Sequence, residues 1–147
     1  ANTIAYNHGI IIGLSTSERL KIEVGSLHQN DTLNMEVTGV DTESKVPRSY
    51  IISSSDLLVV LEPFFEEILR SIDITITSLP PEISSDIINN GVIFCGGMSK
   101  ISGLNKFLQR NFKYPFKIVD DAENVTILGA GKLLSDPVLL ESILKQF

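Results

Sequence analysis

The chain has 147 residues, 43% hydrophobic and 20% charged, which suits one domain or two small lobes with a packed core. Its formal net charge of -6 argues against non-specific binding to nucleic acid or an anionic membrane surface. A single cysteine, Cys95, excludes an internal disulfide, and two histidines leave little room for a zinc site. No apolar run approaches the roughly 20 residues of a membrane-spanning helix, and the N-terminus does not resemble a signal peptide. These features favour a reducing, cytoplasmic location.

The N-terminal part predicts one short helix. Ala1–Tyr6 could be the end of another helix, but its pattern is ambiguous. Ser15 and Glu18 have the spacing of a capping box, and Gly25 stands where a glycine often follows the last helical turn. The sequence therefore predicts a helix over residues 16–24.

A hairpin and a long helix are expected next. Alternating apolar residues predict strands at about 33–40 and 48–53, with a turn-rich stretch between them. An apolar stripe with helical spacing follows from Ser54 or Ser55 onward. Pro63 lies inside this stripe and is expected to kink or restart the helix. The final letters of the segment, IDITITSL, also fit a strand, but helix is preferred.

The second half of the chain alternates helices and strands. Helices are predicted over 81–88, 102–112, 124–134 and 138–146, and strands over 92–95 and 116–119. The order strand, helix, strand is that of a βαβ unit, so the two strands should be parallel.

Two consecutive glycines, Gly96 and Gly97, directly follow the apolar strand expected at 92–95. In an open α/β sheet, ligands bind beyond the carboxyl ends of the strands. Without a β-carbon, both residues let a ligand approach the backbone, and both tolerate a positive φ. A tight turn with no ligand explains the same two letters, so the residues alone leave both interpretations open.

The string LGAGK at residues 128–132 is not a phosphate-binding loop. A Walker A motif needs glycine where Thr126 stands and serine or threonine where Leu133 stands. The small residues are expected instead to let a helix approach a sheet.

No catalytic residue and no metal ligand is predicted. His8 and His28 are expected to be exposed and to lack a carboxylate partner. Cys95 is expected to be a small buried hydrophobic residue of the strand. Asp120 and Asp121 could contact a hydroxyl group or a metal, but an acidic loop or a helix N-cap is favoured.

Four stretches of the chain resemble, in order, conserved blocks of the bacterial actin-like MreB proteins. They are GLSTSERLKIEVGS, MEVTGVDTESKVPRSYIISSSDLLVVLEPF, PPEISSDIINNGVIFCGG and SGLNKFLQRNFKYPFKIVDDAENVTILGAGKLL. The likeness covers about residues 10 to 135, which makes it far more specific than any one motif. One departure is Met98, which stands where the family has a third glycine.

The resemblance implies an α/β fold, the C-terminal half of an actin-like, ribonuclease H-like ATPase of the actin and Hsp70 superfamily. It would combine a βαβ nucleotide-binding subdomain with a small α+β inserted subdomain. Residues 1–14 would end a helix of the nucleotide-binding subdomain, residues 15–65 would form the insert with its helix and hairpin, and residues 66–147 would complete the nucleotide-binding subdomain.

The family binds adenosine between these two subdomains. The positions that the resemblance assigns to this contact are Glu18, Arg19, Leu20 and Lys21 on the short helix and Gly96, Gly97, Met98 and Ser99 at the glycine turn. Glu18 and Lys21 are also spaced to form a simple exposed ion pair, which needs no ligand.

The function implied is that of a cytoskeletal subunit that binds ATP with Mg²⁺ and assembles head to tail into filaments that control cell shape. The whole protein would be a slow ATPase in the cytoplasm, at the inner face of the membrane. This fragment would be inactive alone, because both phosphate loops of the family are absent from it. Other cell-shape or division proteins are possible partners, and neither nucleic acid nor membrane contact is expected from this part. The alternatives are another superfamily ATPase (an FtsA-like, pilus-assembly or chaperone type) or an interaction module without a ligand.

Overall fold

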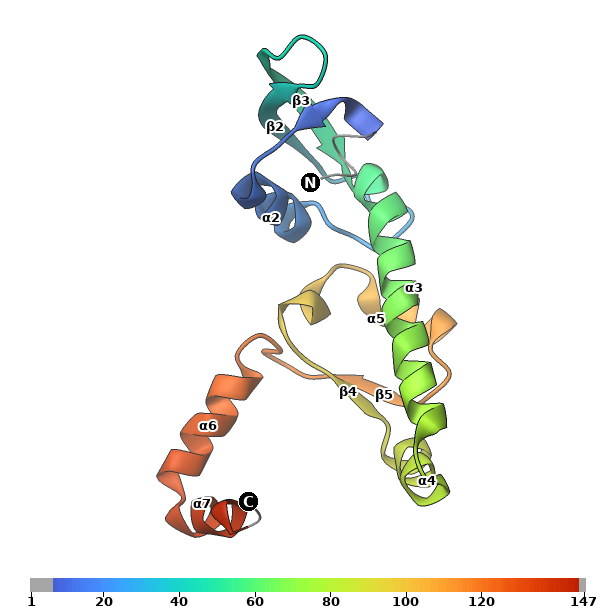
Figure 1. Ribbon diagram of the computed structural model, residues 1–147, viewed down its shortest axis with the longest axis vertical. Coiled ribbons are helices and arrows are strands. Elements are labelled where there is room, and N and C mark those ends of the chain that lie inside the picture. The colour runs from blue at the N-terminus through green and yellow to red at the C-terminus, as the bar shows by residue number, and fades with distance from the viewer. Residues whose placement is uncertain (1–6, 146–147) are drawn as a thin grey trace. The chain divides into compact units, whose positions relative to one another are not determined.

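The computed structural model describes residues 7–145, and the helix end considered at Ala1–Tyr6 lies outside the described residues. The chain forms two units (Figure 1). The first unit contains residues 1–84 and 101–113, and the second contains residues 85–100 and 114–147. These units are not the subdomain division expected at residues 15 and 65, which stays a prediction.

The first unit is built on a three-stranded antiparallel sheet with the strand order β1-β2-β3. The strands are β1 (Ile10–Ile11), β2 (Asn34–Asp41) and β3 (Pro47–Ser53). The hairpin β2–β3 confirms the two predicted strands to within one residue at each end. Its turn is shaped by Asp41, whose carboxylate accepts hydrogen bonds from the backbone nitrogens of Glu43 and Ser44 at 3.0 and 2.7 Å.

Helix α2 (Leu14–Glu23) confirms the first predicted helix, but not the expected capping box. Its N-cap is Gly13 and no side chain caps it, because the helix begins one residue before Ser15. Gly25 follows the C-cap residue Val24 as expected, and its backbone nitrogen bonds to the Leu20 carbonyl at 3.1 Å. A β-carbon on Gly25 would collide with the carbonyl oxygen of Lys21, so close backbone packing explains this glycine.

Helix α3 (Ser54–Ser78) is one continuous helix, so the restart expected at Pro63 does not occur. Leu57 before Pro63 and Phe65 after it are both buried, and this tertiary packing stabilises the helix on both sides of the proline. The IDITITSL ending is helical to Ser78, as preferred. Its hydroxyl groups bond back to carbonyls of the preceding turn, as in Thr75 Oγ1 to the Ser71 carbonyl at 2.9 Å, and so stay compatible with a helix.

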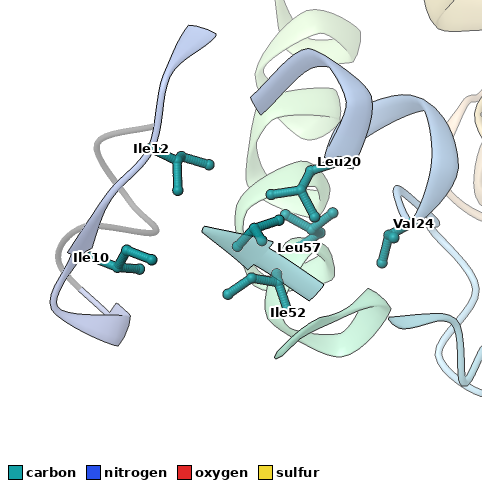
Figure 2. Packing of buried hydrophobic residues seen from close by; sticks show 7 residues of the cluster. Ile10, Ile12, Leu20, Val24, Ile52 and Leu57 are labelled. Atoms are coloured by element: carbon teal, nitrogen blue, oxygen red, sulfur yellow. The ribbon is translucent and has the colours of Figure 1, made fainter. Parts of the chain in front are cut away.

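The core of the first unit lies between the sheet and the helices α2 and α3. Figure 2 labels six of its side chains, contributed by β1 and the residue after it, by α2 and the residue after it, by β3 and by α3. The full cluster consists of Ile10, Ile12, Leu20, Val24, Val37, Ile52 and Leu57. Burial of these aliphatic groups holds the hairpin, α2 and the start of α3 together.

A second packed region of the first unit joins α3 to α5 (Leu104–Asn111). The rings of Phe65 and Phe107 meet edge to face, with their centroids 6.0 Å apart. Leu104 and Leu108 are buried on the same side of α5 as Phe107. This spacing is the apolar stripe of an amphipathic helix, which confirms the helix expected at 102–112.

Helix α4 (Pro81–Asn90) leads along the chain into the second unit, whose two strands are β4 (Val92–Phe94) and β5 (Phe116–Ile118). They pair in parallel, with Val92 opposite Phe116, as the βαβ order predicted. The expectation of a buried strand is wrong within the described residues, because Ile93 is 66% exposed. A two-stranded sheet has too little packing on either face to bury it.

The second unit ends with α6 (Val125–Ser135) and α7 (Pro137–Leu144), close to the helices expected there. Several of their large apolar side chains, such as Leu134 and Val138, are exposed. Across residues 7–145, no helix is long and apolar enough to cross a membrane.

Candidate functional site

The glycine turn predicted as a ligand contact lies at the carboxyl end of β4, in the second unit. Gly96 has a φ of +91°, a conformation that side chains disfavour, and its nitrogen donates a 2.6 Å hydrogen bond to the Ala122 carbonyl. The short 3-10 helix η1 (Gly97–Lys100) follows, and the nitrogen of Ser99 bonds back to the Gly96 carbonyl at 3.0 Å. The backbone itself therefore explains the glycine at position 96.

Gly97 is different, because its backbone does not require a glycine. Its φ lies outside the positive region, and a β-carbon built on it would meet no atom within 4 Å. A β-carbon on Gly96 would also meet nothing within 4 Å. The turn thus presents open space next to two residues without side chains, which is the geometry that a close ligand contact needs.

The loop before α6 holds this turn in place. The Lys100 ammonium group lies 2.6 Å from a carboxylate oxygen of Glu123, and both side chains are about half exposed. Together with the bond from Gly96 to Ala122, this pair fixes η1 against the chain that follows β5. Met98 and Ser99, the other two predicted contact residues, are half-buried in the turn.

The predicted contact residues on α2 lie in the first unit and are considered by themselves. Glu18 and Lys21 form an ion pair of 2.8 Å, as their spacing suggested, and Arg19 pairs with Glu23 at 3.2 Å. Leu20 is fully buried in the core. Only Glu18, Arg19 and Lys21 therefore present side chains that a ligand could reach.

Two of the remaining sequence expectations about single residues are wrong. His8 has a carboxylate partner, since its Nε2 lies 3.4 Å from a carboxylate oxygen of Asp56, a residue 48 positions away in the sequence. Cys95 is exposed, because β4 ends at Phe94 and Cys95 already belongs to the loop.

The acidic pair lies in the loop before α6, which is one of the two interpretations that were favoured, whereas the LGAGK string differs from what was expected. Asp121 has a φ of +50° and accepts a 2.8 Å hydrogen bond from the side chain of Asn124, which is itself the N-cap of α6. Neither aspartate caps the helix. Gly129 and Gly131 lie within α6, and a β-carbon on either would meet nothing within 4 Å. The expected close approach of this helix to a sheet is therefore absent among the described residues.

Sequence reasoning missed a polar cluster in the first unit. The carboxylate of Asp31 accepts hydrogen bonds from the hydroxyl groups of Ser26 at 2.5 Å and Ser102 at 3.1 Å. The bond from Ser26, followed by that from Ser102, holds the pKa of Asp31 below its usual value, although partial burial opposes the shift. Ser102 lies 71 residues from Asp31, and no local motif connects them.

The chain is similar along almost its whole length to one protein family, described as MreB/Mbl protein, which matches residues 1–142. It is 30% identical over 134 residues to the cell shape-determining protein MreB of Escherichia coli strain K12, covering 90% of this chain and 39% of that protein. The chain thus spans about two fifths of the length of the curated relatives that it matches.

Solved structures show the same likeness. The crystal structure of MreB 5 of Spiroplasma citri bound to AMPPNP matches 99% of this chain and 44% of that one, with a TM-score of 0.84 and 29% identity. A MamK double helical filament matches 85% of this chain and 41% of that one, with a TM-score of 0.60 and 17% identity, which supports the fold alone. The α/β actin-like fold expected from the sequence is confirmed.

Proposed function

This chain belongs to the MreB/Mbl protein family, and we propose that it is part of an ATP-binding subunit that polymerises into filaments controlling cell shape. In this proposal, the chain supplies the adenosine side of the nucleotide site and part of the contact between subunits. The whole protein binds ATP with Mg²⁺ and hydrolyses it slowly. This chain alone is inactive, because the sequence contains neither of the phosphate loops on which that chemistry depends.

The open space at Gly97 is the observation that carries the nucleotide part of the proposal. Gly96 has a conformational reason to be glycine, whereas Gly97 has none within the described residues. Gly129 inside α6 also meets open space, but Gly97 lies just after the carboxyl end of β4, where an α/β sheet binds its ligand, and we infer that a ligand occupies the space there. The similar structure of Spiroplasma citri MreB 5 contains AMPPNP, an ATP analogue, which supports an adenine nucleotide as that ligand.

The two other residues of the turn suit the same role. Ser99 offers a hydroxyl group close to the turn, and Met98 adds a flexible, polarisable side chain where the family's third glycine would stand. On α2, the charged groups of Glu18, Arg19 and Lys21 are positioned by their ion pairs and can hydrogen-bond ribose hydroxyl groups. Leu20 would contribute through its backbone only, since its side chain belongs to the core.

A calorimetric titration of ATP into the whole protein tests the proposal at Gly97. The substitution Gly97→Trp fills the open space, and we expect it to weaken binding by at least about tenfold, because it removes room that a bound purine needs. Gly129→Trp is the matched control, since a side chain there also meets open space in the same unit. Equal affinities for Gly97→Trp and the unmodified protein would show that no nucleotide contacts this turn.

Filament formation is a separate part of the proposal and needs its own measurement. We expect the whole protein to form sedimentable polymer when ATP and Mg²⁺ are added, and electron microscopy to show filaments. Subunits that repeat one head-to-tail contact form an open filament when the rotation between neighbours does not close a ring, and the length of such a polymer should grow with protein concentration. If the whole protein binds ATP but stays monomeric at all concentrations, the proposed nucleotide site would be supported and the proposed filament would be contradicted.

The cellular part of the proposal places the whole protein in the cytoplasm, at the inner face of the membrane. Its main partner is another copy of itself, and other cell-shape or division proteins are further partners. The alternative of an interaction module without a ligand is rejected if ATP binds and Gly97→Trp weakens that binding.

A further inference from the structure

A polar hollow of about 420 Å³ lies on the first unit, and it contains none of the residues assigned to the nucleotide. Its lining comes from the loop after α2 and from the outer face of α5. The residues are His28, Gln29, Asn30, Lys106, Gln109 and Arg110. The volume falls in the range of small-molecule sites, which is about 300–1,000 Å³.

The lining has an electrostatic character that is opposite to that of the chain. The whole chain carries a formal net charge of -6, yet the hollow is lined by two permanent cations, Lys106 and Arg110, and by no carboxylate. Asp31, outside the lining, accepts hydrogen bonds from the hydroxyl groups of Ser26 and Ser102, and its carboxylate also interacts with His28 and Lys106, so it offsets one of the two positive charges and Arg110 carries the other. The hollow is therefore a place where an anion is attracted to an otherwise acidic protein.

Lys106 and Arg110 both have N–H donors that make no hydrogen bond to another described residue. The Lys106 ammonium group lies 3.0 Å from Nε2 of His28, and this contact uses at most one of its three N–H donors. The Nε of Arg110 donates to the Lys106 carbonyl at 3.4 Å, which leaves the two terminal guanidinium nitrogens without a partner among the described residues. A guanidinium group can bind two oxygens of one phosphate group, and a neighbouring ammonium group adds a second positive charge.

The other lining residues indicate what chemical group carries the phosphate of the ligand. All six side chains are polar, and three of them, Gln29, Asn30 and Gln109, are amides that both donate and accept hydrogen bonds. Such a surface suits a body rich in hydroxyl groups better than an acyl chain or an aromatic ring, because every lining residue carries a polar group that can hydrogen-bond. We propose that this hollow binds a small sugar phosphate, with the phosphate monoester at Lys106 and Arg110 and the sugar hydroxyl groups at the three amides.

Titration calorimetry of the protein with glucose 6-phosphate, glucose and inorganic phosphate tests the proposal. We expect saturable binding of glucose 6-phosphate, weaker binding of inorganic phosphate and none of glucose. Arg110→Gln should reduce the affinity for glucose 6-phosphate by about tenfold or more, because a charge-assisted hydrogen bond is lost. Arg70→Gln is the matched control, an exposed arginine on α3 outside the hollow.

Three further results separate this site from the nucleotide site and from a folding defect. Gly97→Trp should leave the affinity for glucose 6-phosphate unchanged. If Gly97→Trp lowers that affinity and Arg110→Gln does not, the ligand binds at the nucleotide site and the proposal is overturned. In the unmodified protein, NMR amide shifts on adding glucose 6-phosphate should concentrate at Gln29, Lys106 and Gln109. An absence of saturable binding, or an equal loss in Arg70→Gln, would also overturn it.

Discussion

A β-carbon placed on Gly103 would lie only 2.8 Å from the backbone nitrogen of His28, so these two residues make a backbone contact that only glycine permits. Gly103 also has a φ of +79° as the N-cap of α5. It therefore holds α5 close to the loop after α2. We expect Gly103→Ala to lower the free energy of unfolding of the first unit by more than about 1 kcal/mol, measured by urea titration.

The control for this substitution is Gly129→Ala, in the interior of α6. A β-carbon at Gly129 meets open space, and alanine favours a helix over glycine by about 0.5–1 kcal/mol. We therefore expect Gly129→Ala to stabilise the protein slightly. If Gly103→Ala were as stable as the unmodified protein, the close contact with His28 would not exist in solution.

The capping box of α3 predicts a second stability effect. The Ser53 hydroxyl group accepts a hydrogen bond from the Asp56 nitrogen at 3.3 Å, and the Asp56 carboxylate accepts one from the Ser53 nitrogen at 2.8 Å. Ser53→Ala should cost about 1 kcal/mol of unfolding free energy, because it leaves a helix N–H without a partner. The control Ser71→Ala removes only a mid-helix bond to the Glu67 carbonyl and should change stability by less than about 0.5 kcal/mol.

The hairpin turn predicts a specific pH dependence. Hydrogen bonds from the Ser44 backbone, then from the Tyr50 phenol at 2.7 Å, hold the pKa of Asp41 far below its ordinary value of 3.8. Because the folded-state pKa is lowered, the contribution of Asp41 to stability is complete above pH 3.8 and is lost only as the pH falls further through the folded value. The turn should therefore stay formed at pH 4.

NMR titration of the Asp41 carboxyl carbon measures this effect directly. Tyr50→Phe removes one of the hydrogen bonds to the carboxylate and should move the titration midpoint of Asp41 upward, toward the ordinary value. The same hydrogen bond raises the pKa of Tyr50, so Asp41→Asn should lower the phenol pKa. A midpoint for Asp41 close to 3.8 in the unmodified protein would contradict the turn geometry.

The ion pair between Lys100 and Glu123 should make only a small contribution to stability. Both side chains are about half exposed, at 52% and 48%, and pairs of this kind contribute about 0.2–1 kcal/mol. A double-mutant cycle with Lys100→Met and Glu123→Gln should give a coupling energy in that range, and it should shrink in 1 M salt. A larger coupling that salt does not reduce would mean that the pair is shielded from water in solution.

Local patterns in the sequence were sufficient to predict most of the secondary structure. The alternation around Val37 predicted the hairpin, and the helical stripe through Leu57 and Phe65 predicted α3 even where IDITITSL also fitted a strand. Errors in these elements lay at Pro63, where α3 continues without a restart, and at ends and caps, as at Ser15, because a cap depends on one or two hydrogen bonds that a small shift of the boundary replaces. The glycine turn was likewise located correctly, since two adjacent glycines after an apolar strand are a strong local signal.

Contacts between distant residues had no such signal. The sequence alone determined most of the helices and strands, the parallel pairing of β4 with β5 and the place of Gly97, because each depends on neighbours within a few positions or on a fixed chain order. Only the tertiary structure decided that His8 meets Asp56, that Ile93 is exposed and that His28 lies beside Lys106, 78 residues away. Those outcomes depend on which surfaces pack together, and many sequences with the same local pattern would pack them differently.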